Sequence, residues 1–158
     1  MLDGDRMASL IATYIMKKLG NKTSIKMGVV QTAYANGAST KFLEESGVSV
    51  ECAKTGVKNL HHVALNFDIG IYFEANGHGT VLFSKECIKK LQEENQNELL
   101  LLANLINQTV GDAFSDLFAI EAILHLLNYT MNDWLQMYSD FPNRLMKVSS
   151  LYQFNSPS

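Results

Sequence analysis

Residues 25–53 have the sequence IKMGVVQTAYANGASTKFLEESGVSVECA, and this stretch decides the fold class. Its first part, residues 25–33, is rich in β-branched side chains and predicts a strand. The turn ANGAS then opens a predicted helix over residues 38–46, which ends at a Ser-Gly pair. A second strand is predicted at residues 48–53. Strand, helix and strand in close succession are typical of a parallel βαβ unit.

The same alternation extends on both sides of this unit. Apolar residues at helical spacing predict a helix over residues 3–19 before it and another over residues 57–67 after it. Residues 69–73 and 80–83 are predicted to be strands, and the short loop 74–79 between them contains Asn-Gly and favours a hairpin. We therefore predict an α/β fold, a three-layer αβα sandwich with a small, mixed but mostly parallel four-stranded sheet.

The rest of the chain lacks a strand signal and predicts a helical C-terminal half. An apolar stripe that runs from Leu99 to Val110 and resumes at Phe114 predicts two helices meeting near Gly111. A short helix is expected at residues 132–138, in which Trp134 and Tyr138 have structural roles. A turn at residues 140–143 and a disordered tail over residues 153–158 are expected beyond it.

Composition narrows the class of protein. The 158 residues are 47% hydrophobic and 18% charged, with a net charge of -3, which suits one folded domain. The sequence lacks the basic stripe that would indicate a nucleic-acid partner. Its longest apolar run, residues 99–102, is too short for a membrane span. Cys52 and Cys87 form no CxxC pair, and the acidic N-terminus is unlike a signal peptide. We expect free thiols and a cytoplasmic location.

Three polar loops, at residues 34–39, 54–58 and 74–79, lie at the carboxyl edge of the predicted sheet, where ligands bind in such folds. In the segment KTGVK, Gly56 allows a tight turn between a strand and a helix. The Thr55 hydroxyl, the first helical amides and the Lys58 ammonium can bind an anion there. An ordinary capped turn with a solvated lysine explains the same residues, and the segment alone does not decide between these interpretations.

The loop EANGHG, residues 74–79, is the most distinctive candidate. Glu74 accepts hydrogen bonds, and Asn76 donates and accepts them, so the two side chains can hold neighbouring sugar hydroxyls. Gly77 allows close approach of a ligand, and His78 can exchange protons near neutral pH. A tight hairpin in which Asn-Gly serves only the turn is the alternative.

Metal sites receive little support from the sequence. His61 and His62 are adjacent on a predicted helix and point in different directions, so one is expected to be exposed and the other partly buried, with His61 near the ligand. Asp3 and Asp5 in the segment DGDR are a possible magnesium loop, but they suit a helix N-terminus better. We predict no metal ligands in this chain.

Longer runs of sequence now support a resemblance. The runs GVVQTAYANG (28–37), KTGVKNLHH (54–62), FDIGIYFEANGHG (67–79), GDA-SD (111–116), IEAIL (120–124) and PNR (142–144) resemble the phosphoacetylglucosamine mutases, which belong to the α-D-phosphohexomutase superfamily. The motifs are long and in the same order, and the similarity covers nearly all of the chain. It implies that residues 1–140 correspond to the third of four domains, and residues 141–158 to a linker toward an absent phosphate-binding fourth domain.

The resemblance also implies a function. Members of the family interconvert N-acetylglucosamine 6-phosphate and 1-phosphate, for UDP-N-acetylglucosamine biosynthesis, by means of a phosphoserine and magnesium. The family's sugar loop places Glu74 and Asn76 on the 3- and 4-hydroxyls, with His78 as a possible proton carrier, and Thr55, Gly56 and Lys58 in a second ligand-facing loop. Gly77 belongs to the same sugar loop.

The phosphoserine loop TASHNP, the magnesium loop DGDADR and the phosphate loop RPSGT are all absent from these 158 residues. The resemblance therefore implies a part of a mutase that binds the sugar phosphate together with the other domains and is inactive alone. The alternative is a non-catalytic sugar-phosphate-binding or regulatory module.

Overall fold

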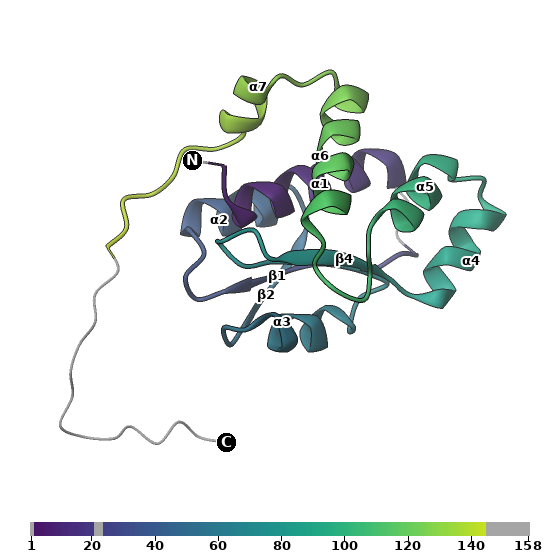
Figure 1. Ribbon diagram of the computed structural model, residues 1–158, viewed down its shortest axis with the longest axis horizontal. Helices are drawn as coiled ribbons and strands as arrows, with labels where there is room; N and C mark the ends of the chain where they lie inside the picture. The colour runs from purple at the N-terminus through teal and green to yellow at the C-terminus, as the bar shows by residue number, and fades with distance from the viewer. Residues whose placement is uncertain (1, 21–23, 145–158) are drawn as a thin grey trace.

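The computed structural model describes residues 2–20 and 24–144 of the chain. In this part, a four-stranded sheet lies between helices on both of its faces (Figure 1). In chain order, the elements are α1 (Gly4–Leu19), β1 (Met27–Thr32), α2 (Gly37–Glu45), β2 (Ser49–Ala53), α3 (Val57–Ala64), β3 (Ile69–Phe73), β4 (Gly79–Phe83), α4 (Lys85–Glu93), α5 (Asn97–Leu105), α6 (Ala113–Leu127) and α7 (Met131–Leu135).

The sheet has the strand order β2-β1-β3-β4. β1 pairs in parallel with both β2 and β3, and β4 pairs with β3 as the antiparallel arm of a hairpin. The crossover from β1 to β2 and the crossover from β2 to β3 run in opposite directions across the sheet. Because such crossovers are right-handed, α2 and α3 lie on opposite faces. The predicted mixed, mostly parallel sheet and αβα layering are confirmed.

Alternate residues of the strands divide the core into two clusters. Val29 belongs to the larger cluster, together with Ile11 of α1 and the other helices of that face. Its neighbour Val30 belongs to the smaller cluster, together with Leu60 of α3. Successive side chains of a strand point to opposite faces, so the continuous apolar run of β1 is what a strand buried on both sides requires.

The helical half differs from its prediction. It contains three helices between residues 84 and 127, and α5 ends at Leu105, although the apolar stripe continues to Val110. The side chain of Asn107 explains this end, because its Oδ1 accepts hydrogen bonds from the amides of Thr109 (3.1 Å) and Val110 (3.3 Å). Such a local bond competes with helical hydrogen bonding. The Thr80 hydroxyl, which donates to the Asn107 carbonyl at 2.8 Å, ties the resulting loop to β4.

A segment that follows α7 is held against the start of α1, and we call residues 136–141 the strap. α7 ends at Leu135, so the predicted helix over 132–138 is too long. Buried Arg6 donates hydrogen bonds to the carbonyls of Leu135 (2.7 Å) and Tyr138 (3.1 Å) and to the Asp140 carboxylate (2.9 Å). The Arg6 side chain thus satisfies backbone carbonyls at and beyond the end of α7, and the chain leaves the helix at this point.

The strap continues to the loop after β1. Phe141 and Asn36 exchange two hydrogen bonds of 3.0 Å each, one from the Asn36 side-chain amide and one from the Phe141 backbone amide. At residues 140–143, where the sequence predicts a turn, the chain instead contacts the loop after β1 through Phe141. The predicted linker begins here, and its residues 145–158 lie outside the described part of the chain.

Both cysteines are free, as predicted, with Cys52 exposed on the edge strand β2 and Cys87 buried in α4. Burial raises the pKa of the Cys87 thiol to about 11. No helix within residues 2–20 and 24–144 has the length and apolar character needed to cross a membrane.

Candidate functional site

Two of the three predicted ligand loops meet at one edge of the sheet. Because β1, β2 and β3 are parallel, the loops that follow them lie at their common carboxyl edge. There the Gly56 amide donates a 2.9 Å hydrogen bond to Oε1 of Glu74. Glu74 is partly exposed, and the structure gives it no ion pair among the described residues. We call the residues of loops 54–58 and 74–78 the rim.

Gly56 is placed at the start of α3 by an unusual backbone conformation. Its φ of +108° lies in the region that only glycine adopts readily. No side chain caps the helix at this point, so the Thr55 hydroxyl does not act as a cap. Thr55 and Lys58 are both exposed. The exposed Lys58 fits a solvated lysine as well as a ligand contact, so both interpretations of this segment stay predictions.

The second loop is a tight turn whose side chains remain accessible. The Glu74 carbonyl accepts from the Gly77 amide at 2.8 Å, and the Glu74 amide donates to the His78 carbonyl at 2.9 Å. Asn76 Oδ1 accepts from the His78 amide at 2.8 Å. Asn76 is exposed, and its side-chain nitrogen makes no hydrogen bond within the described residues, so it can donate to a ligand. The turn and a ligand site are thus compatible.

Gly4 supports this loop, and the sequence analysis did not identify it. The Gly4 amide donates to the Ala75 carbonyl at 3.2 Å, so the first turn of α1 touches the loop. A Cβ atom at Gly4 would lie 1.8 Å from the Glu74 carbonyl oxygen. In the sequence, this contact was indicated only by a glycine in the first turn of an amphipathic helix, which is weak evidence for a close approach.

A pocket of about 320 Å³ opens beside the rim. It contains two of the predicted site residues and two others with aromatic rings. Its lining residues are Val57, Lys58, His61, Tyr72, His78, Thr109, Val110 and Gly111. Nδ1 of His61 lies 3.1 Å from the Tyr72 hydroxyl, and the two rings meet edge to face. Burial, and then the charge of Asp116, raises the pKa of Tyr72. His61 is partly buried and His62 exposed, as predicted.

The third predicted loop has a structural role. Asn36 caps α2 and binds the strap, and its backbone amide donates to the Asp5 carboxylate at 2.9 Å. Burial raises the pKa of Asp5. Asp3 caps α1 by accepting from the Arg6 amide at 3.1 Å. Both acidic residues of DGDR therefore organise a helix N-terminus, which confirms the preferred interpretation.

The described residues contain no group of three or more His, Cys, Asp or Glu side chains arranged to hold a metal ion. Asp3 and Asp5, the best candidates in the sequence, are already engaged by backbone amides. The residues present therefore do not fit a magnesium site.

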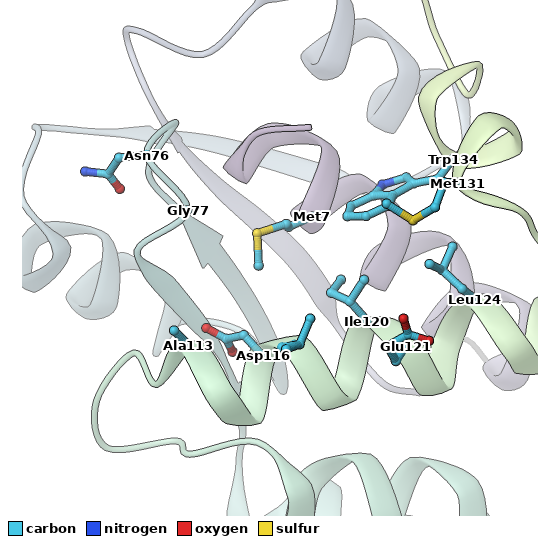
Figure 2. A pocket seen from close by; sticks show the side chains of 11 residues that line it. Met7, Asn76, Gly77, Ala113, Asp116, Ile120, Glu121, Leu124, Met131 and Trp134 are labelled. Carbon is cyan, nitrogen blue, oxygen red and sulfur yellow. The ribbon is translucent and has the colours of Figure 1, made fainter. Parts of the chain in front are cut away.

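A second pocket, of about 350 Å³, lies between α1, α6, α7 and the hairpin loop, and we call it the α6 groove (Figure 2). Its lining residues are Met7, Asn76, Gly77, Ala113, Asp116, Leu117, Ile120, Glu121, Leu124, Met131 and Trp134. The Asp116 side chain is only 4% exposed, and burial, followed by the Asp112 charge, raises its pKa to about 7. The sequence analysis missed Asp116, although an acidic residue inside an apolar stripe was a visible signal.

Comparison with known proteins identifies relatives of the whole domain. The family model described as phosphoacetylglucosamine mutase AMG1, domain III, matches residues 3–129. The phosphoacetylglucosamine mutases of Candida albicans and Homo sapiens are each 49% identical to the chain over 94% of its length. The chain spans about 30% of the length of each of these relatives.

Solved structures give the same result. A crystal structure of the Aspergillus fumigatus N-acetylphosphoglucosamine mutase, in complex with GlcNAc-6P and magnesium, superposes with a TM-score of 0.88 and 46% identity. It covers 94% of this chain, which corresponds to 32% of that protein. A substrate complex of an N-acetylglucosamine-phosphate mutase, described as a member of the α-D-phosphohexomutase superfamily, superposes with a TM-score of 0.85 and 46% identity. It covers 89% of this chain and 29% of that protein. The chain belongs to the phosphoacetylglucosamine mutase family, and the part of the family that it represents is domain III.

Proposed function

We propose that the chain supplies sugar recognition to a phosphoacetylglucosamine mutase, which interconverts N-acetylglucosamine 6-phosphate and 1-phosphate. The observation that carries this proposal is the Glu74 carboxylate, which is held at the carboxyl edge of the sheet by the Gly56 amide, 2.9 Å away. A carboxylate oriented in this way retains lone pairs for the hydroxyls of a neutral sugar. The family relationship supports the identity of the substrate, since a relative is in complex with GlcNAc-6P.

Three side chains of the hairpin loop divide the task. Glu74 accepts hydrogen bonds from the 3- and 4-hydroxyls, and the Asn76 side-chain nitrogen, which is not used by the turn, donates to one of them. Gly77 permits the close approach of the sugar ring. His78 carries a proton near the sugar in this proposal, which is supported by its position in the lining of the pocket beside the rim.

The loop after β2 serves the charged part of the substrate. Lys58 is exposed on the first turn of α3, Thr55 precedes that turn, and the Glu74 carboxylate accepts from the Gly56 amide at the helix N-terminus. A phosphate or a sugar hydroxyl that approaches this point meets a positive charge and free helical amides. The motifs of the phosphoserine, magnesium and phosphate loops do not occur in the sequence, so phosphoryl transfer requires other parts of a longer protein. We place this reaction in the cytosol, because both cysteines are free thiols.

A domain exchange tests the proposal. The corresponding 30% of the Candida albicans mutase is replaced by this chain, and conversion of N-acetylglucosamine 6-phosphate is measured. Glu74→Gln in this chimera keeps an acceptor for the Gly56 amide but loses the charge. We expect kcat/KM to fall about tenfold to a hundredfold, the range for hydrogen bonds to charged groups.

The matched control is Glu51→Gln, which changes an exposed carboxylate on β2 and should leave kcat/KM unchanged. The isolated chain should show no mutase activity. Full activity of the Glu74→Gln chimera would contradict the assigned role. Saturable binding of the sugar phosphate by the isolated chain, lost in Glu74→Gln, together with an inactive chimera, would instead favour the non-catalytic binding module.

A further inference from the structure

The α6 groove is apolar and open, although it belongs to a folded domain. Met7 of α1 and Ile120 and Leu124 of α6 point toward the same space in Figure 2, and Trp134 of α7 borders it. At its edge, Leu117 and Met131 are each 55% exposed. Large apolar side chains that are exposed together beside an apolar pocket are typical of a face that another protein segment covers.

Asp116 makes the groove chemically specific. It lies in the first turn of α6, and its Oδ1 is buried without a hydrogen-bond partner among the described residues. The apolar side chains around it cannot compensate the cost of burying a carboxylate, which is several kcal/mol for an unpaired ion. Figure 2 shows the Asp116 carboxyl group at the wall of the groove, below the loop that carries Gly77.

The charge of the groove has one sign. Glu121, one turn further along α6, also lines it, and no lysine or arginine is among the lining residues. Within the described ranges, the lysine and arginine ion pairs lie elsewhere, on Asp140, Glu98 and Glu45. A partner that carries a cation between apolar groups would therefore complement both the charge and the walls of the groove.

We infer that the α6 groove binds a lysine or arginine side chain, flanked by apolar residues, from another part of the longer mutase polypeptide. The cation pairs with the Asp116 carboxylate, and the apolar flanks cover Leu117 and Met131. The mutase polypeptide is the appropriate source because the chain spans only about 30% of the length of its relatives, so most of their sequence lies outside this domain. The inference depends on family membership and not on sugar binding by Glu74, so its test does not use activity.

The first test uses the opposite signs that Asp116→Asn should give in two settings. In the isolated chain at pH 8, the variant removes an unpaired buried charge, and Tm should rise by about 2–8 °C. In the Candida albicans chimera, the variant removes one member of an ion pair and leaves the partner's cation buried, so Tm should fall by a similar amount. Glu51→Gln should leave Tm unchanged in both proteins. A rise or no change in the chimera would overturn the inference.

The second test measures coverage of the groove and does not depend on the stability of Asp116→Asn. Leu117→Cys is made in a Cys52→Ser background, and its rate of reaction with a maleimide is compared between the two proteins. Lys89→Cys, on the exposed surface of α4, is the control for reagent access. We expect Leu117→Cys to react at least tenfold more slowly in the chimera. Equal rates would show an uncovered groove and overturn the inference.

The same measurements distinguish two other possible ligands of the α6 groove from a segment of the mutase polypeptide. Protection of Leu117→Cys in the isolated chain that increases with protein concentration would show that a second copy fills the groove. Stabilisation of the isolated chain by butylammonium at millimolar concentration, with no protection in the chimera, would show a site for small amines. Either result, together with equal rates of Leu117→Cys in the chimera and in the dilute isolated chain, contradicts docking within the mutase polypeptide.

Discussion

The rim and the α6 groove are adjacent regions that share the hairpin loop, and each contains a carboxyl group in a different environment. At the rim, Glu74 is partly exposed and accepts a hydrogen bond from the Gly56 amide. In the groove, Asp116 is 4% exposed and its Oδ1 has no partner among the described residues. The Glu74 carboxylate thus has a hydrogen-bond partner within this domain, whereas no lysine or arginine lines the groove beside Asp116.

An exposed acidic residue and a buried one therefore have different roles. A carboxylate that is hydrated and fixed by one backbone amide retains its charge and can exchange water for sugar hydroxyls at little cost. A carboxylate that is buried without a partner destabilises the domain until a cation reaches it. The following variants test whether the two regions differ in this way, and they are taken in order of expected effect.

The largest effect should come from Gly4→Ala, which acts on the support of the rim. The new Cβ would lie 1.8 Å from the Glu74 carbonyl oxygen and 2.8 Å from its carbonyl carbon, and these are backbone atoms that cannot move independently. We expect the free energy of unfolding to fall by about 3 kcal/mol or more. Denaturation with urea, followed by circular dichroism, measures this change.

Gly37→Ala is the matched control. It also changes a glycine in the first turn of a helix, but the nearest atom to its new Cβ would be a Phe141 ring carbon at 3.5 Å, an ordinary contact. The free energy of unfolding should rise by no more than about 1 kcal/mol, because alanine favours a helix more than glycine does. Equal effects of the two substitutions would mean that Gly4 does not hold the loop in place.

Asp116→Asn should have the next largest effect, and that effect should depend on pH. The pKa of Asp116 is raised to about 7 from a model-compound value of 3.8. Between these two values the folded chain binds more protons than the unfolded chain, so the free energy of unfolding decreases as pH rises from about 4 to about 7. Replacement by asparagine removes this decrease, because the amide does not ionise.

The variant should therefore exceed the native chain in stability by about 1–3 kcal/mol at pH 8, and the difference should shrink toward pH 4. Urea denaturation of both proteins at several pH values measures the difference, and other titrating groups cancel because both proteins contain them. A difference that is constant across this range would show that Asp116 does not titrate as its burial requires.

The sheet half of the fold could be predicted closely from the sequence, and the helical half could not. β3 was predicted with its observed bounds because five apolar residues between polar turns leave few alternatives. The apolar stripe from Leu99 to Val110 predicted a helix that is present but ends earlier, at Leu105, because the Asn107 side chain forms a turn that competes with the helix. The end of α7 depends on Arg6, which is 129 residues distant from Leu135 in the chain.

The site could be predicted in part. The loops containing Gly56 and Glu74 were identified from polar residues after strands, and their hydrogen bond shows that they meet. The support from Gly4 and the burial of Asp116 depend on contacts between α1, α6 and the hairpin loop, which sequence spacing does not reveal. Asn36 lies in the predicted ligand loop 34–39, and its contacts with α2 and the strap were not visible in the sequence.

Tyr72→Phe should have a smaller effect on the pocket beside the rim. The substitution keeps the buried ring and removes the hydroxyl that lies 3.1 Å from Nδ1 of His61. We expect the free energy of unfolding to fall by about 0.5–1.5 kcal/mol, the usual contribution of one such bond. His61→Phe removes the other partner, so the double variant should lose less stability than the sum of the two single losses in a double-mutant cycle. A cycle that shows no coupling would mean that the two groups do not interact in solution.

Glu74→Gln should have the smallest effect on stability, and this result would complete the contrast with Asp116. The glutamine side-chain oxygen can still accept a hydrogen bond from the Gly56 amide, and the position is partly exposed, so the free energy of unfolding should change by less than about 0.5 kcal/mol. Urea denaturation of the isolated chain measures it. A substitution that is neutral for folding but reduces kcat/KM in the chimera assigns the carboxylate to ligand binding. Destabilisation by 2 kcal/mol or more would show instead that the charge of Glu74 holds the two loops together, and the loss of activity would then follow from the loss of structure.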